Sequence, residues 1–260
     1  MQPSPSSLVS TYMKQLTTIK SLTIITLLFI GTTLFTSCSD DGMCIKGNNN
    51  QSTTSYSPTD FESITLDGSF NVEITQGDTY EIEVTGDDNI IDYFEYDIRN
   101  GNCVLSLEDG CYKNYDLRVE ITTPTLEGIY LDGSGDIKVQ NFEDMTSLEV
   151  RLDGSGNIRF NELNGLKNAD FNINGSGNIT IQDEESTLDN NIIQISGSGN
   201  YNGFKLISNN VEAYIDGSGN IDTHAESNLK ARISGSGNIR YKGSPVVDAM
   251  TSGSGNISRK

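Results

Sequence analysis

The second half of the chain repeats a pattern in which apolar and polar residues alternate on both sides of a glycine-rich corner. The tetrapeptide Gly-Ser-Gly-Asn or Gly-Ser-Gly-Asp occurs seven times, at intervals of 21, 21, 22, 20, 18 and 18 residues. Its first glycines are Gly133, Gly154, Gly175, Gly197, Gly217, Gly235 and Gly253. Alternation with period two is typical of strands that bury one face. Each repeat is therefore predicted to be a strand, a corner and a second strand, followed by a variable connection.

Stacking of these repeats predicts a solenoid. Two short strands cannot bury an apolar face by themselves, so each repeat must pack on the next one. A length of 18 to 22 residues fits one coil of a β-helix. A propeller blade needs about 40 residues, and a leucine-rich repeat needs its own leucine and asparagine pattern. The expected fold class is all-β: a right-handed β-helix-like solenoid whose coils turn at Gly-Ser-Gly-Asn corners.

The corner residues have expected structural roles. Glycine tolerates backbone conformations with positive φ that a Cβ atom opposes, so the seven first glycines are predicted to be structural turns. Stacked coils would also align the polar residue after each corner in a ladder of side-chain amides, which is structural rather than a binding site. Its members would be Asp136, Asn157, Asn178, Asn200, Asn220, Asn238 and Asn256.

The stretch from Phe61 to Thr123 alternates in the same way and contains a degenerate copy of the corner at Gly68. One β-solenoid domain is therefore predicted over residues 61–260. Within it, residues 87–98 interleave acidic residues with Tyr93, Phe94 and Tyr96. These aromatic side chains either form a contact surface or, as is commoner, cover one end of the solenoid.

Residues 1–37 are predicted to be a lipoprotein signal peptide. Lys14 and Lys20 lead into a 15-residue apolar stretch, which is shorter than the roughly 20 residues of a transmembrane helix. The segment ends in Phe35-Thr36-Ser37-Cys38, which resembles a bacterial lipobox and predicts cleavage before Cys38 and lipidation of its thiol. Met13 is an alternative start to Met1 and would give a signal of more ordinary length.

The residues after Cys38 suggest where the protein is placed. Two aspartates follow closely, as in the surface-export signal of Bacteroidetes-type lipoproteins. The expected location is the bacterial outer membrane, lipid-anchored and facing either the periplasm or the surface. Residues 38–60 are polar and are predicted to be a flexible tether.

An exported chain can form disulfides. With Cys38 lipidated, three cysteines remain. Cys103 and Cys111 are the predicted disulfide, because they are close in sequence and flank the turn candidate Asp109-Gly110. Whether Cys44 is free stays open. A metal site made of three thiols without histidine is not expected in an oxidising compartment.

The opening segment from Phe61 to Ile74, followed by the repeated Asp-Gly-Ser-Gly-Asn-Ile corners, resembles the head GIN domain family. Members of that family are labelled auto-transporter adhesins and are common among Bacteroidetes lipoproteins. The resemblance extends to Ile257. It implies an all-β, β-helix-like domain at the cell envelope.

The composition limits the classes of function that the chain can have. The formal net charge of −19 argues against nucleic acid as a partner. His224 is the single histidine, and Asp132, Asp153 and Asp216 share their column with Asn and Ser, so no acid–base cluster is evident. The chain is predicted to be a non-catalytic adhesion, binding or structural module without cofactor or metal. The alternative is a polysaccharide-active β-helix enzyme or a calcium-dependent carbohydrate binder.

The partners expected are the membrane, through the lipid, and an extracellular protein or glycan; nothing in the sequence indicates an oligomer. The charge is uneven, however. Residues 225–260 contain six basic and two acidic residues, against nine and 34 in residues 38–224. This basic end either docks on an acidic partner or another copy's acidic body, or protects the last strands from pairing with other chains.

Overall fold

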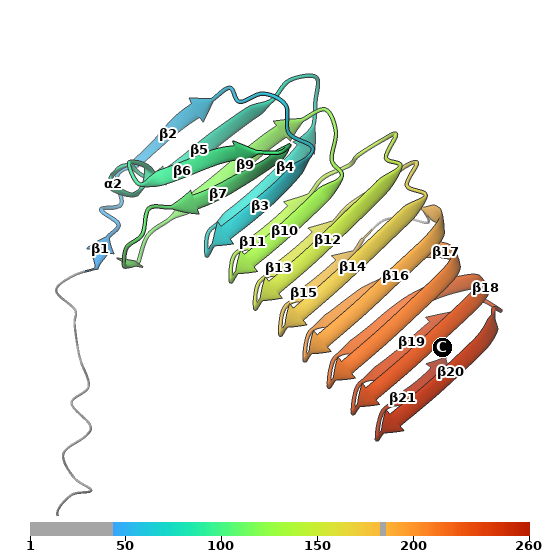
Figure 1. The fold of residues 1–260 in the computed structure, drawn as a ribbon. Coiled ribbons are helices and arrows are strands. Elements are labelled where there is room, and N and C mark those ends of the chain that lie inside the picture. Colours follow the sequence, from blue (N-terminus) through green and yellow to red (C-terminus); the bar gives the residue numbers. More distant parts are fainter. Residues whose placement is uncertain (1–43, 183–185) are drawn as a thin grey trace, which may run out of the picture. The chain divides into compact units, whose positions relative to one another are not determined.

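The computed structural model describes residues 44–182 and 186–260, which fold into a β-solenoid (Figure 1). Two ladders of parallel strands meet at the Gly-Ser-Gly corners, with six turns from Gly133 to Gly253. The predicted all-β solenoid is confirmed. The proposed signal peptide and Cys38 lie outside the described residues. Within those residues, no helix is long and apolar enough to cross a membrane.

The first ladder takes from each coil the strand before the corner. Its members are β3 (Ser63–Gly68), β10 (Gly128–Gly133), β12 (Ser147–Gly154), β14 (Asn168–Gly175), β16 (Thr187–Gly197), the second halves of β17 (Asn200–Gly217) and β18 (Asn220–Gly235), and β20 (Val246–Gly253). The second ladder takes the strand after the corner. Its members are β4 (Asn71–Gln76), β11 (Asp136–Val139), β13 (Asn157–Phe160), β15 (Asn178–Ile181), the first halves of β17 and β18, β19 (Asn238–Lys242) and β21 (Asn256–Arg259).

Alternation along the strands places the core between the two ladders. Ile129, Val150, Phe171 and Ile193 occupy the same position in successive coils, and each is 0% exposed. Burying one such side chain contributes about 1.5–3 kcal/mol relative to leaving it in water. The stack therefore derives its stability from apolar columns that run from coil to coil.

Each corner glycine is required for two separate reasons. The seven first glycines have φ between 123° and 144°, the conformation predicted for the corner. Gly175, in the middle of the stack, has φ 139°, and a Cβ atom there would lie 2.3 Å from the carbonyl oxygen of Gly154 in the previous coil. That carbonyl accepts a hydrogen bond from the N–H of Ser176 at 2.9 Å. Any other residue would strain the corner and push neighbouring coils apart.

Both ladders continue past the first coil to form a closed end. In the first ladder, β7 (Asn102–Leu107) runs parallel to β3, and β6 (Phe94–Arg99) is antiparallel to β7. In the second, β9 (Leu117–Thr123) runs parallel to β4, followed by antiparallel β5 (Glu81–Asp87) and β2 (Gln51–Tyr56). A short helix, α2 (Asp88–Ile91), and the paired strands β1 (Ile45–Lys46) and β8 (Tyr112–Lys113) complete this end. We call it the capped end.

The structure differs from the tether predicted over residues 38–60. Residues 45–46 and 51–56 form β1 and β2, and all six residues of β2 pair with β5. No apolar pattern marks this segment, because β2 is an edge strand in which no residue is fully buried. Strand structure in the described residues therefore begins at Ile45, inside the predicted tether.

Candidate binding site at the capped end

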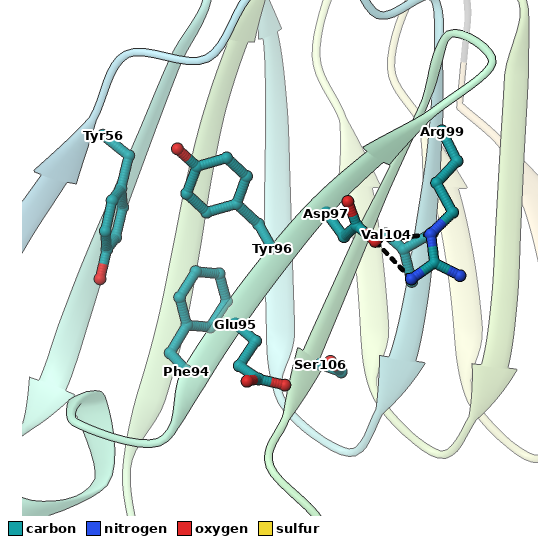
Figure 2. Close-up of a pocket in the computed structure, with 8 residues that line it drawn as sticks. All are labelled: Tyr56, Phe94, Glu95, Tyr96, Asp97, Arg99, Val104 and Ser106. Atoms are coloured by element: carbon teal, nitrogen blue, oxygen red, sulfur yellow. Dashed lines mark hydrogen bonds and ion pairs between the residues drawn. The ribbon is translucent and has the colours of Figure 1, made fainter.

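A pocket of about 590 Å³ lies beside β6 at the capped end (Figure 2). Its lining consists of the last residue of β2, five residues of β6 and two residues of β7. The lining residues are Tyr56, Phe94, Glu95, Tyr96, Asp97, Arg99, Val104 and Ser106. Apolar and charged surfaces therefore meet in one hollow.

The aromatic residues of this region close the solenoid core. Phe94 is only 7% exposed, and its ring centroid lies 6.0 Å from that of Phe70. Tyr56 packs outside it, 6.0 Å from Phe94 and 5.2 Å from Tyr96. Phe94 therefore covers one end of the solenoid, which is the commoner of the two roles expected. Tyr56 and Tyr96 stay half-buried and present ring surface to the pocket.

Tyr93 lies outside the pocket. Its ring centroid is 5.6 Å from that of Tyr112, which in turn packs against Tyr115. These three tyrosines connect the turn after α2 with β8. The aromatic segment predicted from the sequence is therefore divided between two local clusters.

The charged side chains lie on the outer side of β6. Glu95, Asp97 and Arg99 are exposed, and the Arg99 guanidinium pairs with the Asp97 carboxylate at 2.5 Å. An ion pair this exposed contributes little to stability. Rings beside carboxylates and a guanidinium can instead accept an apolar group that is flanked by polar or charged ones.

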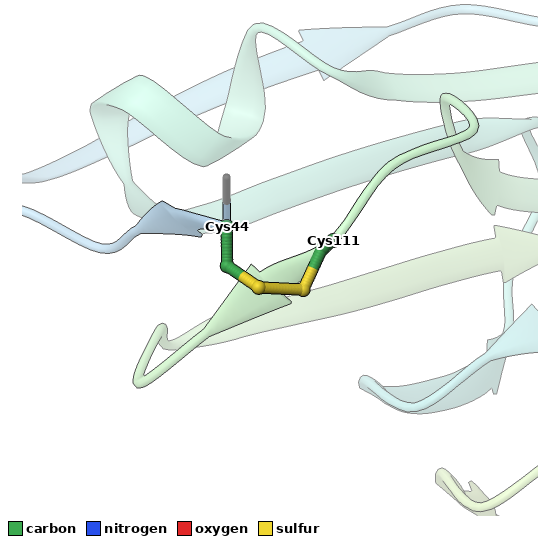
Figure 3. The surroundings of a disulfide bond; sticks show 2 residues. All are labelled: Cys44 and Cys111. Atoms are coloured by element: carbon green, nitrogen blue, oxygen red, sulfur yellow. A yellow bond between two sulfur atoms is a disulfide. The ribbon is translucent and has the colours of Figure 1, made fainter. Parts of the chain in front are cut away.

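The disulfide joins Cys44 to Cys111, so the predicted Cys103–Cys111 bond is wrong (Figure 3). The cause is the parallel pairing of β1 with β8, in which Ile45 aligns with Tyr112. This register places the two preceding residues side by side, with Cα atoms 4.5 Å apart. The sequence does not reveal the pairing of Cys44 with Cys111, because neither β1 nor β8, each two residues long, has an apolar pattern.

Cys103 is the free cysteine among the described residues. It faces the core from β7, opposite Ile64, and is 0% exposed. Burial, and then the charge of Asp97, raises the pKa of its thiol to about 12. This thiol packs as an apolar side chain.

The predicted asparagine ladder is present. Asn178 donates from Nδ2 to Asn157 Oδ1 at 2.8 Å, and Asn200 donates to Asn178 at the same distance. Asn157 donates to Asp136, which heads the ladder as expected, and Asn220 and Asn238 continue it. These amides are bonded from coil to coil as far as Asn238, which is the structural role predicted for them.

A second asparagine ladder was not anticipated. Asn190, Asn210 and Asn228 each donate to the asparagine one coil earlier, beginning from Asn168. Their spacings of 22, 20 and 18 residues equal the intervals between the corners. The same column analysis, extended further from the glycines, would have found it.

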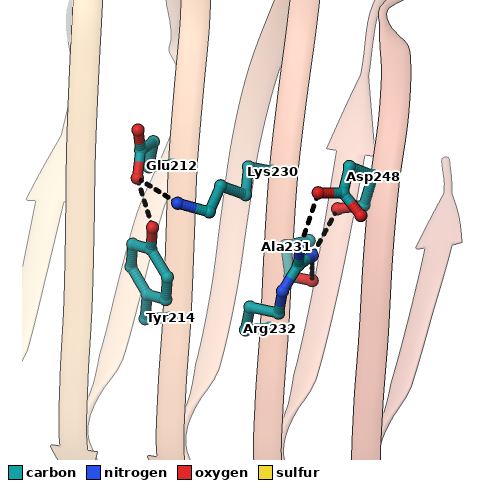
Figure 4. Close-up of polar contacts among 6 residues, drawn as sticks. All are labelled: Glu212, Tyr214, Lys230, Ala231, Arg232 and Asp248. Atoms are coloured by element: carbon teal, nitrogen blue, oxygen red, sulfur yellow. Dashed lines mark hydrogen bonds and ion pairs between the residues drawn. The ribbon is translucent and has the colours of Figure 1, made fainter.

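Several of the basic residues near the last coils are neutralised by carboxylates (Figure 4). Lys230 lies 3.1 Å from Glu212, which also accepts a hydrogen bond from Tyr214. The Tyr214 and Lys230 hydrogen bonds lower the pKa of Glu212. Arg232 pairs with Asp248 at 2.5 Å, and Arg240 pairs with Asp222 at 2.7 Å.

Three other basic residues have different neighbours. Lys242 and Lys260 lie over the ring of Phe204, at 5.0 Å and 4.6 Å from its centroid. Arg259 donates to Ser244 Oγ at 2.9 Å. Unlike Lys230, Arg232 and Arg240, none of the three pairs with a carboxylate of the described residues.

The structure aligns Asp132 with Asp153 in the neighbouring coil, whereas Asp216 aligns with Ser196 and Ser234. Asp153 pairs with Arg151 at 2.5 Å and accepts a hydrogen bond from Asn174 at 2.7 Å. His224 is hydrogen-bonded to Glu226 at 2.8 Å. Within residues 44–182 and 186–260, no group of three or more His, Cys, Asp or Glu residues could hold a metal ion.

Comparison with known proteins gives one family. A model described as "Putative auto-transporter adhesin, head GIN domain" matches residues 60–245. No curated protein matches the chain.

Several solved structures share the fold. A "putative adhesin" of Bacteroides fragilis is 26% identical, with a TM-score of 0.76, over 83% of this chain and 100% of the other. A "putative lipid binding protein" of Parabacteroides distasonis is 25% identical, with a TM-score of 0.68, over 83% and 99%. A "putative adhesin" of Parabacteroides merdae is 26% identical, with a TM-score of 0.60, over 84% and 99%.

Proposed function

Because the chain belongs to the head GIN domain family, we propose that it is a non-catalytic adhesion or binding module of the cell envelope, anchored to the outer membrane by lipid on Cys38. Family members and structural neighbours are described as adhesins, which supports a binding role over an enzymatic one. Rigid coils, tied together by buried apolar columns and asparagine ladders, suit a protein that presents a fixed surface.

The Cys44–Cys111 disulfide is the observation that supports this proposal most directly. Disulfides persist in exported proteins, which agrees with the predicted signal peptide. Cys44 is six residues after Cys38, and six extended residues span at most about 20 Å. The disulfide therefore fastens the folded domain close to the proposed lipid, where a long tether would have let it diffuse freely.

Fractionation of cells that express Cys38→Ala tests the anchor. We expect the parent protein in the outer membrane and the variant released from it or left unprocessed. Cys44→Ala is the matched control, because it removes the other cysteine of this segment but should keep the lipid. A Cys38→Ala protein that still fractionates with membrane lipid would contradict the proposed anchor. Protease treatment of intact cells then separates surface display from a periplasmic orientation.

The non-catalytic role is tested separately. We expect no turnover of common polysaccharides and no increase in melting temperature when calcium is added. Turnover that is lost on replacing a small set of carboxylates would instead support the polysaccharide-active enzyme.

A further inference from the structure

The last coil exposes the column that is buried in every earlier coil. Val247, Ala249 and Thr251 of β20 pair with Leu229, Ala231 and Ile233 of β18, which are at most 2% exposed. All eight residues of β20 are nevertheless exposed. The large hydrophobic residues that are exposed within the described part of the chain all lie on this strand: Val246, Val247 and Met250, at 76%, 39% and 63%.

The outer edge of β20 is also open. Among residues 44–182 and 186–260, β20 pairs only with β18, and β21 pairs only with β19, so both ladders end in unpaired backbone groups. Edge strands are usually protected by lysine, proline or an inward charge. β20 has no lysine, arginine or proline, and its single charge, Asp248, is paired with Arg232. Edge protection, one of the two roles expected for the basic end, does not describe this strand.

The capped end presents a matching pair of edges. β6 pairs only with β7, and β2 pairs only with β5, within the same residues. Tyr96 and Ile98 of β6 align with the buried Leu105 and Cys103 but are themselves only half-buried. The apolar column is therefore unfinished at this end too, and the pocket lies along it.

Charge favours contact between opposite ends over contact between identical ends. Lys242, Arg259 and Lys260 lie around β21 without a carboxylate partner in the described chain, whereas β2 at the capped end has no charged residue. Two open ends placed face to face would bring these basic groups together. An open end placed on a capped end, with β21 beside the uncharged β2, avoids this repulsion.

We propose that the open end of one copy docks on the capped end of a second copy, so that β20 pairs with β6 and β21 with β2. Along a shared axis, β20 and β6 would run antiparallel, because β6 is antiparallel to the ladder that contains β20. Val247 and Ala249 would continue the column of Tyr96 and Ile98, and Met250 would reach the pocket. Because the two surfaces differ, the contact is heterologous and can repeat along a row of molecules.

Blocking one end at a time tests this arrangement. The protein used is the mature chain from residue 38 with Cys38→Ser, so that no lipid contributes to association. Val247→Lys blocks the open end and Tyr96→Lys blocks the capped end. Sedimentation velocity over a range of concentrations should show association of the parent and a dissociation constant raised at least about tenfold, or 1.4 kcal/mol, in each variant. An equimolar mixture of the two variants should form a 1:1 dimer through the two intact ends.

Other outcomes are distinct. A parent that stays monomeric at every concentration, or a mixture that does not form the dimer, overturns the proposal. Self-association that survives in Tyr96→Lys but not in Val247→Lys would show contact between identical open ends and would also overturn it. Gln194→Lys is the matched control, since it adds the same charge at an exposed position of the middle coils and should leave association unchanged. Met250→Lys and Asp97→Lys repeat the test with outward-facing residues if a first variant fails to fold.

Discussion

The two ends of the solenoid are built differently. At the capped end, β2, β5 and β6 reverse direction, α2 and the β1–β8 pair lie beside them, and a disulfide fixes the first described residue. At the open end, the last coil has the same form as the coils before it and simply lacks a following one in the described chain. A repeat is stabilised by its two neighbours, so the same residue matters less in a coil with only one.

This difference separates the residues that maintain the fold from those available for contact. Coils in the middle use both faces for stacking, and their polar side chains are bonded to adjacent coils. Unused strand edges and apolar surface remain at the ends. Changes in the middle should therefore alter stability, and changes at the ends should alter association.

The largest contrast is expected between two corner glycines. Gly175→Val and Gly253→Val introduce the same strain, since both have positive φ and a Cβ atom at either would lie within 2.3 Å of a carbonyl oxygen. For Gly175→Val, in the middle of the stack, we expect the free energy of unfolding to fall by about 3 kcal/mol or more. The backbone strain of about 1–3 kcal/mol is added to the cost of separating two stacked coils. Urea unfolding measures both variants. Gly253→Val should change the global unfolding free energy by less than about 1 kcal/mol, because only the last coil frays.

Equal losses for the two glycines would contradict the stacked arrangement. A loss of stability on replacing only one of the corner glycines, with no loss at the others, would also contradict the stacked arrangement.

The corners show why the regular part could be predicted and the capped end could not. The repeated glycines report a local requirement, because each of them needs its conformation whatever the remainder of the chain does. The register of the ladders then follows from equal spacing. At the capped end, the strand partners of β2 and β5 depend on contacts between distant segments that do not repeat. The Cys44–Cys111 bond depends on two strands of two residues each, which no periodicity can reveal.

Removing the disulfide should have the next largest effect. Cys44→Ser releases a bond that spans 67 residues, and loss of a native disulfide typically costs about 2–4 kcal/mol. Thermal unfolding should show a lower melting temperature, with the capped end losing amide hydrogen-exchange protection first. Unchanged protection of β2 and β5 would mean that the disulfide does not support the cap.

Thiol labelling of the parent protein tests the core around Cys103 separately, because Cys44→Ser would also free the exposed thiol of Cys111. The pKa of Cys103 lies at about 12 in the folded protein, above the ordinary value, so the thiol stays protonated at pH 8–9. We expect no reaction with a thiol reagent there until the protein unfolds. Reaction of Cys103 in the folded parent would show that β7 opens independently.

A smaller contrast is expected along the asparagine ladder. Asn178 donates to Asn157 and accepts from Asn200, so Asn178→Ala leaves one donor and one acceptor without partners and should cost about 1–2 kcal/mol. Asn256 is exposed in the last coil, and Asn256→Ala should hardly change the free energy of unfolding. Chemical denaturation of the two variants measures the difference. Equal effects would mean that the amides act through their own strands and that the ladder adds nothing.

The smallest effect is expected at a polar group inside the stack. Tyr201 is 0% exposed, burial raises the pKa of its phenol, and its hydroxyl lies beside the Asn191 side chain without forming a hydrogen bond of good geometry. Removing an unsatisfied buried hydroxyl while keeping the ring should be neutral or stabilising by up to about 1 kcal/mol, so Tyr201→Phe should melt at the same temperature or slightly higher. Tyr96→Phe at the capped end is the control, since that side chain is only half-buried and its hydroxyl loses little. If Tyr201→Phe instead lowers stability by more than about 1 kcal/mol, the hydroxyl must have a partner, either the buried Asn191 side chain or an internal water, and the middle coils would contain a buried polar contact among their apolar columns.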